Sequence, residues 1–191
     1  MKYDAILCGV GGQGGISVSV VVARAAMATG LRVKQSEVHG MSQRGGEVLA
    51  HLRISDAEPS SPTIPLGTAD IILAFEPLEA LRYLPWLSRD SGRVVSAIAP
   101  IRNMAGYPEI EAILAELRAL PRSVLLDADA IARDAGNVRA ANMALIGAAS
   151  HYLPLPPEAI ERAIMDIFER KGESVVAANL RAFRDGRKAN T

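Results

Sequence analysis

Three glycines near the start of the chain have a spacing that can bind a nucleotide. Gly9, Gly11 and Gly14 fit the pattern G-x-G-x-x-G between two apolar runs, which lets a dinucleotide pyrophosphate approach the N-terminus of a helix. Such a site also needs an acidic residue at the end of the next strand to bind the ribose. Residues 31–36 offer none, and Glu37 comes only in the loop that follows. The pattern indicates either a nucleotide site or a tight turn that packs a helix on a sheet, and both stay open.

A second loop, residues 36–46, carries polar side chains and paired glycines suited to contact with a ligand or a partner. If both loops follow strands of a parallel sheet, they emerge at the same carboxyl edge and face one crevice. Arg44 offers a forked cation that suits phosphate or carboxylate, and the alternative is a surface arginine beside an ordinary turn. The candidate residues of the two loops are Gly11, Gly12, Gln13, Gly14, Ser42, Gln43, Arg44, Gly45 and Gly46.

Two further residues are candidates for the same crevice. His39 can titrate near neutrality, but no nucleophile or carboxylate at motif spacing accompanies it, so a hydrogen-bonding loop histidine is the simpler interpretation. Asn142 stands among alanine and methionine in a predicted helix, where asparagine is a poor helix former. We therefore expect Asn142 to point into the crevice. Asp127, which follows a predicted strand, is expected to cap a helix rather than to act as an acid or base.

Composition limits the classes of function. The 191 residues are 49% apolar and 22% charged, with 21 basic and 21 acidic side chains, so no net field favours nucleic acid or a membrane surface. The single cysteine, Cys8, excludes an intrachain disulfide and any cluster held by several thiolates. No metal-ligand spacing surrounds the histidines, so we predict no metal. The start lacks a signal-peptide pattern, and the apolar residues 16–28 are too few to span a bilayer, which predicts a cytoplasmic protein.

Apolar runs that alternate with helical patterns predict one three-layer α/β/α domain over residues 1–191, with a mostly parallel sheet and a Rossmann-like start. Alternation in residues 47–54 predicts an antiparallel member with one buried face and one face that meets solvent or a partner. The C-terminal helices are expected over about 157–186, with Ser174 as a cap and Gly186 after the last helix. The expected strands cover residues 4–8, 31–36, 47–54, 70–75, 93–98 and 123–126.

Four strings carry a resemblance over nearly the whole chain: Gly-Val-Gly-Gly-Gln-Gly-Gly at 9–15, Glu-Val-His-Gly-Met-Ser-Gln-Arg-Gly-Gly at 37–46, Asn-Met-Ala-Leu-Ile-Gly at 142–147 and Asn-Leu-Arg-Ala-Phe at 179–183. With them, the chain resembles the gamma-type catalytic domain of the 2-oxoacid:ferredoxin oxidoreductases, in particular the small subunits that act with indolepyruvate. The 37–46 string is the most specific, and it is shared only in outline by subunits acting on pyruvate or branched-chain oxoacids.

The resemblance implies a subunit of an oxidoreductase that decarboxylates an aryl pyruvate with coenzyme A and passes electrons to ferredoxin. It implies that a large partner subunit holds thiamine diphosphate and the iron–sulfur clusters, and that this chain binds neither alone. The loops around Gln13 and Arg44 would then line the subunit interface or a coenzyme A crevice. Whether the isolated chain forms a homodimer stays open. The alternatives are a free-standing nicotinamide or flavin oxidoreductase, and a docking module that touches no ligand.

Overall fold

The structure is a computed structural model that describes residues 1–39 and 45–190, without the side chains of Ile16 and His39. Three candidate residues, Ser42, Gln43 and Arg44, lie outside the described residues. The strands are β1 Lys2–Val10, β2 Arg32–His39, β3 Glu47–Ser55, β4 Ile71–Ala74, β5 Arg93–Ala97 and β6 Ser123–Leu126. The α-helices are α1 Gly15–Ala28, α2 Pro77–Arg82, α3 Ile110–Ala119, α4 Ala128–Asp134, α5 Ala141–Ala149, α6 Pro157–Phe168 and α7 Glu173–Lys188. Short 3-10 turns occupy Leu84–Trp86, Val138–Ala140 and Glu169–Lys171.

The strands form one six-stranded sheet in the order β2-β3-β1-β4-β5-β6. β1 runs parallel to β4, with Leu7 opposite Leu73, and β4, β5 and β6 continue in parallel. β3 lies between β1 and β2 and is antiparallel to both. The predicted α/β fold with a mostly parallel sheet and an antiparallel strand near residue 50 is therefore confirmed. The carboxyl ends of β1, β2, β4, β5 and β6 lie at one edge.

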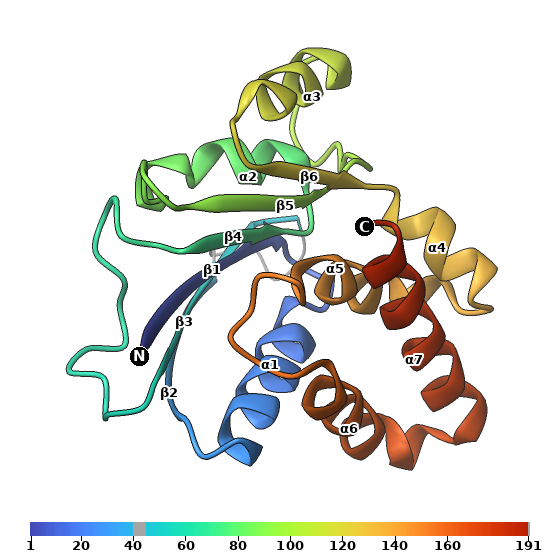
Figure 1. Ribbon diagram of the computed structural model, residues 1–191. Coiled ribbons are helices and arrows are strands. Elements are labelled where there is room, and N and C mark those ends of the chain that lie inside the picture. Colours follow the sequence, from blue (N-terminus) through green and yellow to red (C-terminus); the bar gives the residue numbers. More distant parts are fainter. Residues whose placement is uncertain (40–44, 191) are drawn as a thin grey trace.

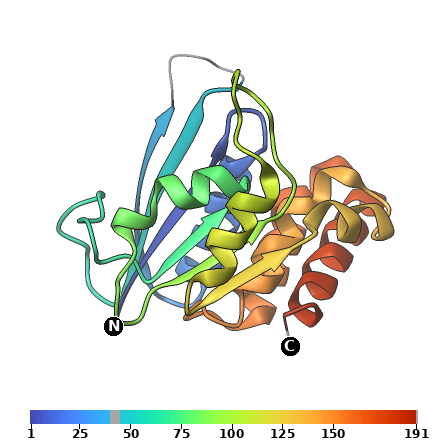
Figure 2. The same cartoon turned by 90° about the horizontal axis from the view of Figure 1, so that it is seen from above.

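Helices cover both faces of the sheet (Figure 1). Successive side chains of a strand point to opposite faces, so Leu7 packs in the core under α1 and the C-terminal helices, while Ile6 packs in a second core under α2 and α3. The view from above shows the C-terminal helices gathered at one end of the molecule (Figure 2), where α6 packs on α1 and α7 packs on α5. No helix of the described residues is long and apolar enough to cross a bilayer.

The last helix differs from the prediction at both ends. Gly172, rather than Ser174, is the N-terminal cap of α7, and the helix runs through Gly186 to Lys188. Gly186 lies inside the helix because α5 crosses it closely: a Cβ there would lie 2.0 Å from the carbonyl oxygen of Ala144. This glycine therefore marks a helix crossing rather than a helix end.

The second face of β3 is covered, which the alternation in the sequence did not predict. His51 and Leu49 are buried there, because the chain between β3 and β4 folds back over the strand. The Ile64 N–H donates to His51 Nδ1 at 3.2 Å, and Arg53 donates to the carbonyl oxygens of Ser61 and Thr63 at 3.1 Å each. His51 and Arg53 thus hold a loop of the same chain, whereas solvent or a partner was expected on this face.

The buried His51 predicts a stability that depends on pH. Burial and then the nearby Arg53 cation lower the pKa of His51 below its usual 6.5, because both disfavour the protonated imidazole. In the unfolded chain His51 takes up a proton near pH 6.5, so stability is complete above that pH and falls as the pH drops below it. Urea unfolding at pH 7.5 and 5.5 should give a lower midpoint at pH 5.5. A His51→Gln variant should lose most of that difference, and equal pH dependence in both proteins would refute the assignment.

Candidate functional site

The first glycine loop is a tight turn between β1 and α1. Gly12 and Gly14 have φ angles of 100° and 79°, a region that residues with a Cβ rarely adopt. A Cβ on Gly9 would lie 2.7 Å from Gln13 Oε1 and 3.0 Å from Phe75 Cβ. The glycines therefore allow a close approach of the turn to the end of β4, which is one of the two roles that their spacing predicts.

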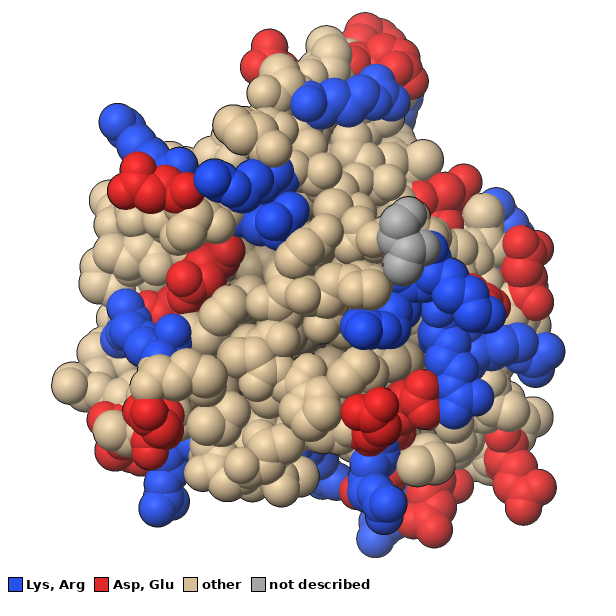
Figure 3. Space-filling view, viewed as in Figure 1, with Lys and Arg blue, Asp and Glu red and all other residues tan. Residues whose placement is uncertain are grey.

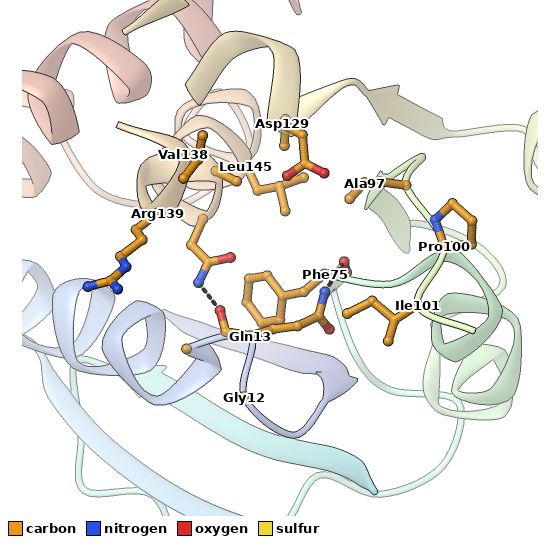
Figure 4. A pocket seen from close by; sticks show the side chains of 15 residues that line it. Gly12, Gln13, Phe75, Ala97, Pro100, Ile101, Asp129, Val138, Arg139 and Leu145 are labelled. Carbon is orange, nitrogen blue, oxygen red and sulfur yellow. Dashed lines mark hydrogen bonds between the residues drawn. The ribbon is translucent and has the colours of Figure 1, made fainter. Parts of the chain in front are cut away.

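Gln13 holds this turn through both ends of its side-chain amide. The Val10 N–H donates to Gln13 Oε1 at 2.7 Å, and Gln13 Nε2 donates to the Phe75 carbonyl oxygen at 2.8 Å. The second bond is drawn as a dashed line in Figure 4. The Gln13 amide, a candidate for ligand contact in the sequence, thus forms hydrogen bonds to the backbone of the protein itself. It joins the carboxyl ends of β1 and β4.

The two glycine-containing loops lie together, as the sequence predicts for strands that end at one edge. The Gly11 N–H donates to the Gly46 carbonyl oxygen at 2.8 Å, and the Gly45 N–H donates to the Gly11 carbonyl oxygen at 3.4 Å. His39 is the last residue of β2 rather than a loop residue, and its side chain is outside the description. The structure therefore brings Gly11, Gly45 and Gly46 into contact through their backbones.

Asn142 comes to the same turn from a distant part of the chain. It lies in the first turn of α5, where its Nδ2 donates to the Gln13 carbonyl oxygen at 2.5 Å. The same nitrogen would lie 3.1 Å from a Cβ on Gly14. An asparagine in this helix is explained by a contact that fixes α5 against the glycine turn.

A cavity of about 460 Å³ opens beside the turn at the carboxyl edge of the sheet (Figure 4). In this view Gln13 and Phe75 lie below the cavity and Asp129 above it, with Pro100 and Ile101 on the right and Arg139 on the left. The lining residues are Gly12, Gln13, Gly14, Phe75, Ala97, Ala99, Pro100, Ile101, Ala128, Asp129, Val138, Arg139, Ala141, Asn142 and Leu145. Of the candidate residues, Gly12, Gln13, Gly14 and Asn142 line the cavity, while Gly11, Gly45 and Gly46 contact one another through the hydrogen bonds described above.

Much of the cavity wall was missed by the sequence reasoning. Phe75 follows β4, the residues around Pro100 follow β5, and Asp129 follows β6. The rule that ligands bind outside the carboxyl ends of parallel strands applies to all of them. It would have identified these positions had it been extended beyond the first two strands.

The charged groups near the cavity do not form a catalytic set of the usual kind. Within the described part of the chain, no three His, Cys, Asp or Glu residues are arranged to hold a metal ion. Burial, and then the nearby Glu79 and Glu76, raise the pKa of the Cys8 thiol, so it stays protonated and is buried as predicted. Asp127 accepts from the Ala130 N–H at 2.9 Å and caps α4, also as predicted. The cavity can bind and orient a ligand, and none of the described residues that line it is a nucleophile paired with a base.

Charges of both signs are spread over the molecule. On the face seen in Figure 3, basic side chains gather over α4 and α7, acidic ones lie among and beside them, and the middle is largely uncharged. Among the described residues, Arg184 pairs with Glu161 through two hydrogen bonds of 2.8 and 2.7 Å, and Lys188 pairs with Asp185. Much of the basic cluster is thus neutralised locally.

Comparison with known proteins identifies the fold and the family. The structure superposes on the pyruvate oxidoreductase subunit PORC of Thermotoga maritima with a TM-score of 0.75 and 23% identity, over 98% of this chain and 96% of that one. It also matches a 2-oxoglutarate:ferredoxin oxidoreductase of Magnetococcus marinus with a TM-score of 0.77 and 22% identity, over 99% of this chain. This chain spans 31% of the Magnetococcus chain, whose structure has 2-oxoglutarate, coenzyme A and succinyl-CoA bound.

Two further relatives have a higher sequence identity to this chain than these two solved structures have. The chain is 40% identical to indolepyruvate oxidoreductase subunit IorB of Archaeoglobus fulgidus, over 97% of this chain and 94% of that protein. It is 41% identical to IorB of Methanothermobacter thermautotrophicus, over 97% and 96%. The family model described as pyruvate ferredoxin/flavodoxin oxidoreductase matches residues 4–189. The resemblance found in the sequence is confirmed: the chain belongs to the pyruvate ferredoxin/flavodoxin oxidoreductase family, as one of its small oxidoreductase subunits.

Proposed function

We propose that this chain is the small subunit of an indolepyruvate:ferredoxin oxidoreductase and completes an active site whose cofactors are held by a large partner subunit. The complex oxidatively decarboxylates an aryl 2-oxoacid with coenzyme A, which yields an aryl acetyl-CoA, carbon dioxide and reduced ferredoxin. One observation carries the proposal: a cavity of about 460 Å³, lined by segments that are distant in the sequence, opens at the sheet edge of a chain that is 40–41% identical to indolepyruvate oxidoreductase subunits over 97% of its length. Such a site suits a subunit that binds and orients what another subunit transforms.

The residues of this chain do not fit the redox cofactors of the proposed reaction. An iron–sulfur cluster needs several cysteine thiolates, and the chain has one cysteine, which is buried. The sequence also lacks a G-D-G string followed by Asn-Asn of the kind a thiamine diphosphate site would have. The division of labour that the family resemblance implies, with these cofactors on a large subunit, agrees with both observations.

Exposed apolar side chains support a partner at the same edge. Among the described residues, Val38 near the end of β2, Met104 after β5 and Val138 at the cavity are 54%, 51% and 65% exposed. All three lie toward the edge of the sheet at which the cavity opens, and a partner bound along that edge would cover them. The cavity would then lie at the interface with the large subunit, and we expect the complex in the cytoplasm.

A free-standing nicotinamide or flavin enzyme is the second candidate, and the sheet order argues against it. In a dinucleotide fold the second strand lies beside the first and ends in the acid that binds the ribose. Here β3 separates β1 from β2. Glu37 lies within β2 and its carboxylate accepts from Ser19 Oγ of α1 at 3.1 Å. The nucleotide pattern of the glycines is thus left without its ribose partner.

Reconstitution tests the proposal directly. The chain is mixed with its proposed large partner subunit, and viologen reduction is measured with indolepyruvate, phenylpyruvate and pyruvate, each with and without coenzyme A. We expect activity only when both subunits are present, with a preference for the aryl substrates. Equal activity of the large subunit alone would remove the central claim. The molar mass of the isolated chain, measured by light scattering, would report whether it self-associates through the uncovered edge.

A substitution of Arg44 tests whether this chain contacts the ligand or only docks on the large subunit. Its forked cation suits a phosphate or carboxylate, so Arg44→Ala in the reconstituted complex should raise the apparent KM for coenzyme A or the oxoacid roughly tenfold, the loss of one charge-assisted hydrogen bond. Subunit assembly, measured by gel filtration, should be unchanged. If the variant weakens assembly and leaves the KM unaltered at saturating subunit, the chain is a docking module at this position.

A further inference from the structure

The segment between β5 and α3 forms one side of the cavity without regular secondary structure. We call residues 99–107 the strap. Ala99, Pro100 and Ile101 line the cavity, and the tip of the strap reaches the start of β3 (Figure 2), where Asn103 Nδ2 donates to the Gly45 carbonyl oxygen at 2.5 Å. The strap therefore connects the cavity wall to the loop that carries the specific family string.

A single buried carboxylate anchors the strap. Glu76 is 1% exposed, and its two oxygens have separate tasks. Oε2 accepts from the Glu79 N–H at 3.0 Å, which caps α2, while Oε1 accepts from the Ile101 N–H at 3.3 Å and from the Tyr107 hydroxyl. One oxygen thus holds the helix that follows β4, and the other holds two points of the strap.

The carboxylate of Glu76 depends on these donors. Within the described part of the chain, no ion pair to a Lys, Arg or His side chain is formed by Glu76. A buried carboxylate without a cationic partner is tolerable only when hydrogen-bond donors surround it. Burial, and then the hydrogen bond to Glu76, raise the pKa of Tyr107, so its hydroxyl remains a donor at physiological pH. Loss of either strap contact leaves the carboxylate partly unsatisfied.

Glu76 and the residue before it contact two different walls of the cavity, the strap and the glycine turn. The residue before it, Phe75, accepts through its carbonyl oxygen from Gln13 Nε2 of the glycine turn. Glu76 itself accepts from Ile101 of the strap. Two consecutive residues at the end of β4 therefore fix the glycine turn on one side and the strap on the other. The width of the cavity is determined at this junction.

We infer that Glu76 is a positioning residue that holds the strap against the cavity and thereby sets the affinity of the site for its coenzyme A or 2-oxoacid ligand. This inference rests on the proposed function for its ligand, and on the contacts above for its geometry. Glu76 does not touch the reacting atoms. It acts through the backbone of Ile101 and the hydroxyl of Tyr107.

The first measurement concerns the strap itself. Arg102 is exposed in the strap, so trypsin cleavage after it, followed by mass spectrometry of the full-length chain, reports how often the strap opens. Tyr107→Phe keeps the ring and removes one strap contact, and it should speed this cleavage roughly fivefold, the loss of one hydrogen bond. Tyr152→Phe is the matched control, because it also removes a hydroxyl hydrogen bond, to Asn190 at 3.3 Å, on a different part of the molecule. It should leave cleavage after Arg102 unchanged.

The second measurement concerns the ligand. In the reconstituted complex, Tyr107→Phe should raise the apparent KM for coenzyme A or indolepyruvate about threefold to tenfold while kcat stays within twofold. Glu76→Gln should raise it similarly, because an amide satisfies only some of the donors that the carboxylate accepts. Tyr152→Phe should have the wild-type KM. If Glu76→Gln fails to fold, the apparent KM of Tyr107→Phe alone tests the inference.

The outcomes separate this inference from the proposed function. Unchanged KM in a complex that needs this chain overturns the inference, even if the strap is cleaved faster, because Glu76 would then be merely structural. If Tyr107→Phe is cleaved after Arg102 as slowly as the wild type, the hydrogen bond to Glu76 does not hold the strap and the inference is overturned. Activity of the large subunit without this chain defeats the proposed function instead, while the trypsin experiment still reports on the strap.

Discussion

Replacing Gly147 with alanine is expected to lower the melting temperature by about 10 °C, or to prevent folding. A Cβ at this position would lie 2.0 Å from the Phe183 carbonyl oxygen and 2.8 Å from the Arg187 nitrogen of α7. These are backbone atoms inside a helix, so they cannot move aside as a side chain could. Overpacking of a core costs about 1–3 kcal/mol and occasionally more, and each kcal/mol shifts the melting temperature of a chain of this size by about 2–4 °C.

The same close contact between α5 and α7 is made by a glycine of α7. A Cβ on Gly186 would lie 2.0 Å from the Ala144 carbonyl oxygen, so Gly186→Ala should have a similar effect. α5 and α7 thus cross where each contributes a glycine, and their backbones touch. Because α5 also carries Asn142, separation of these helices should disturb the glycine turn as well as the core.

Helix propensity gives the control for this prediction. Alanine is a better helix former than glycine by about 1 kcal/mol, so Gly147→Ala should stabilise α5 if propensity dominated. Ala177→Gly changes an exposed position of α7 and should cost about 1 kcal/mol by propensity alone. Thermal unfolding followed by circular dichroism compares the three proteins. A Gly147→Ala chain as stable as wild type would contradict the close crossing.

The second large effect is expected from Gln13→Ala, which should reduce kcat/KM of the reconstituted complex by about a hundredfold. The change leaves the Val10 N–H and the Phe75 carbonyl oxygen without their partners at the carboxyl ends of β1 and β4. Because Asn142 holds the backbone of the same residue, the whole turn is expected to shift. A misplacement of about 1 Å can cost on the order of a hundredfold in rate.

Gln35→Ala is the matched control for Gln13. Gln35 Nε2 also donates side-chain hydrogen bonds, one of them to Ser19 Oγ at 2.9 Å, but between β2 and α1 and not at the cavity. Its removal should leave kcat/KM within about threefold of wild type, since surface and half-exposed substitutions usually change stability by less than about 0.5 kcal/mol. Equal losses in both variants would mean that the effect of Gln13→Ala arises from general destabilisation.

The sequence predicted those parts of the fold that follow from local patterns. The apolar run before Gly9 and the four-residue run 123–126 became strands, as short apolar runs bounded by turn residues indicate, although in β6 only Leu126 is fully buried. The meeting of the two glycine-containing loops followed from strand direction alone. Asn142 was found because a poor helix former in a helix needs a partner, and the structure supplies Gln13.

Other features depended on contacts between distant segments that no local pattern encodes. The face of β3 with His51 was expected to meet solvent or a partner, because alternation shows that a face is polar but does not show what covers it. Gly186 was taken for a helix end, since a glycine needed for a helix crossing looks the same in sequence as a glycine that ends a helix. The strap was missed because its anchor, Glu76, lies far from it in the chain.

The antiparallel β3 has a consequence for how this scaffold can vary. With β3 between them, the ends of β1 and β2 are roughly 10 Å apart, two strand spacings, and β2 and β3 form a hairpin whose register runs from Arg32 opposite Ser55 to His39 opposite Val48. A hairpin tip can change in length and sequence while its paired strands stay in place. Changes in the connection between β2 and β3 are therefore expected to leave the register of these strands, and the sheet that holds them, unchanged.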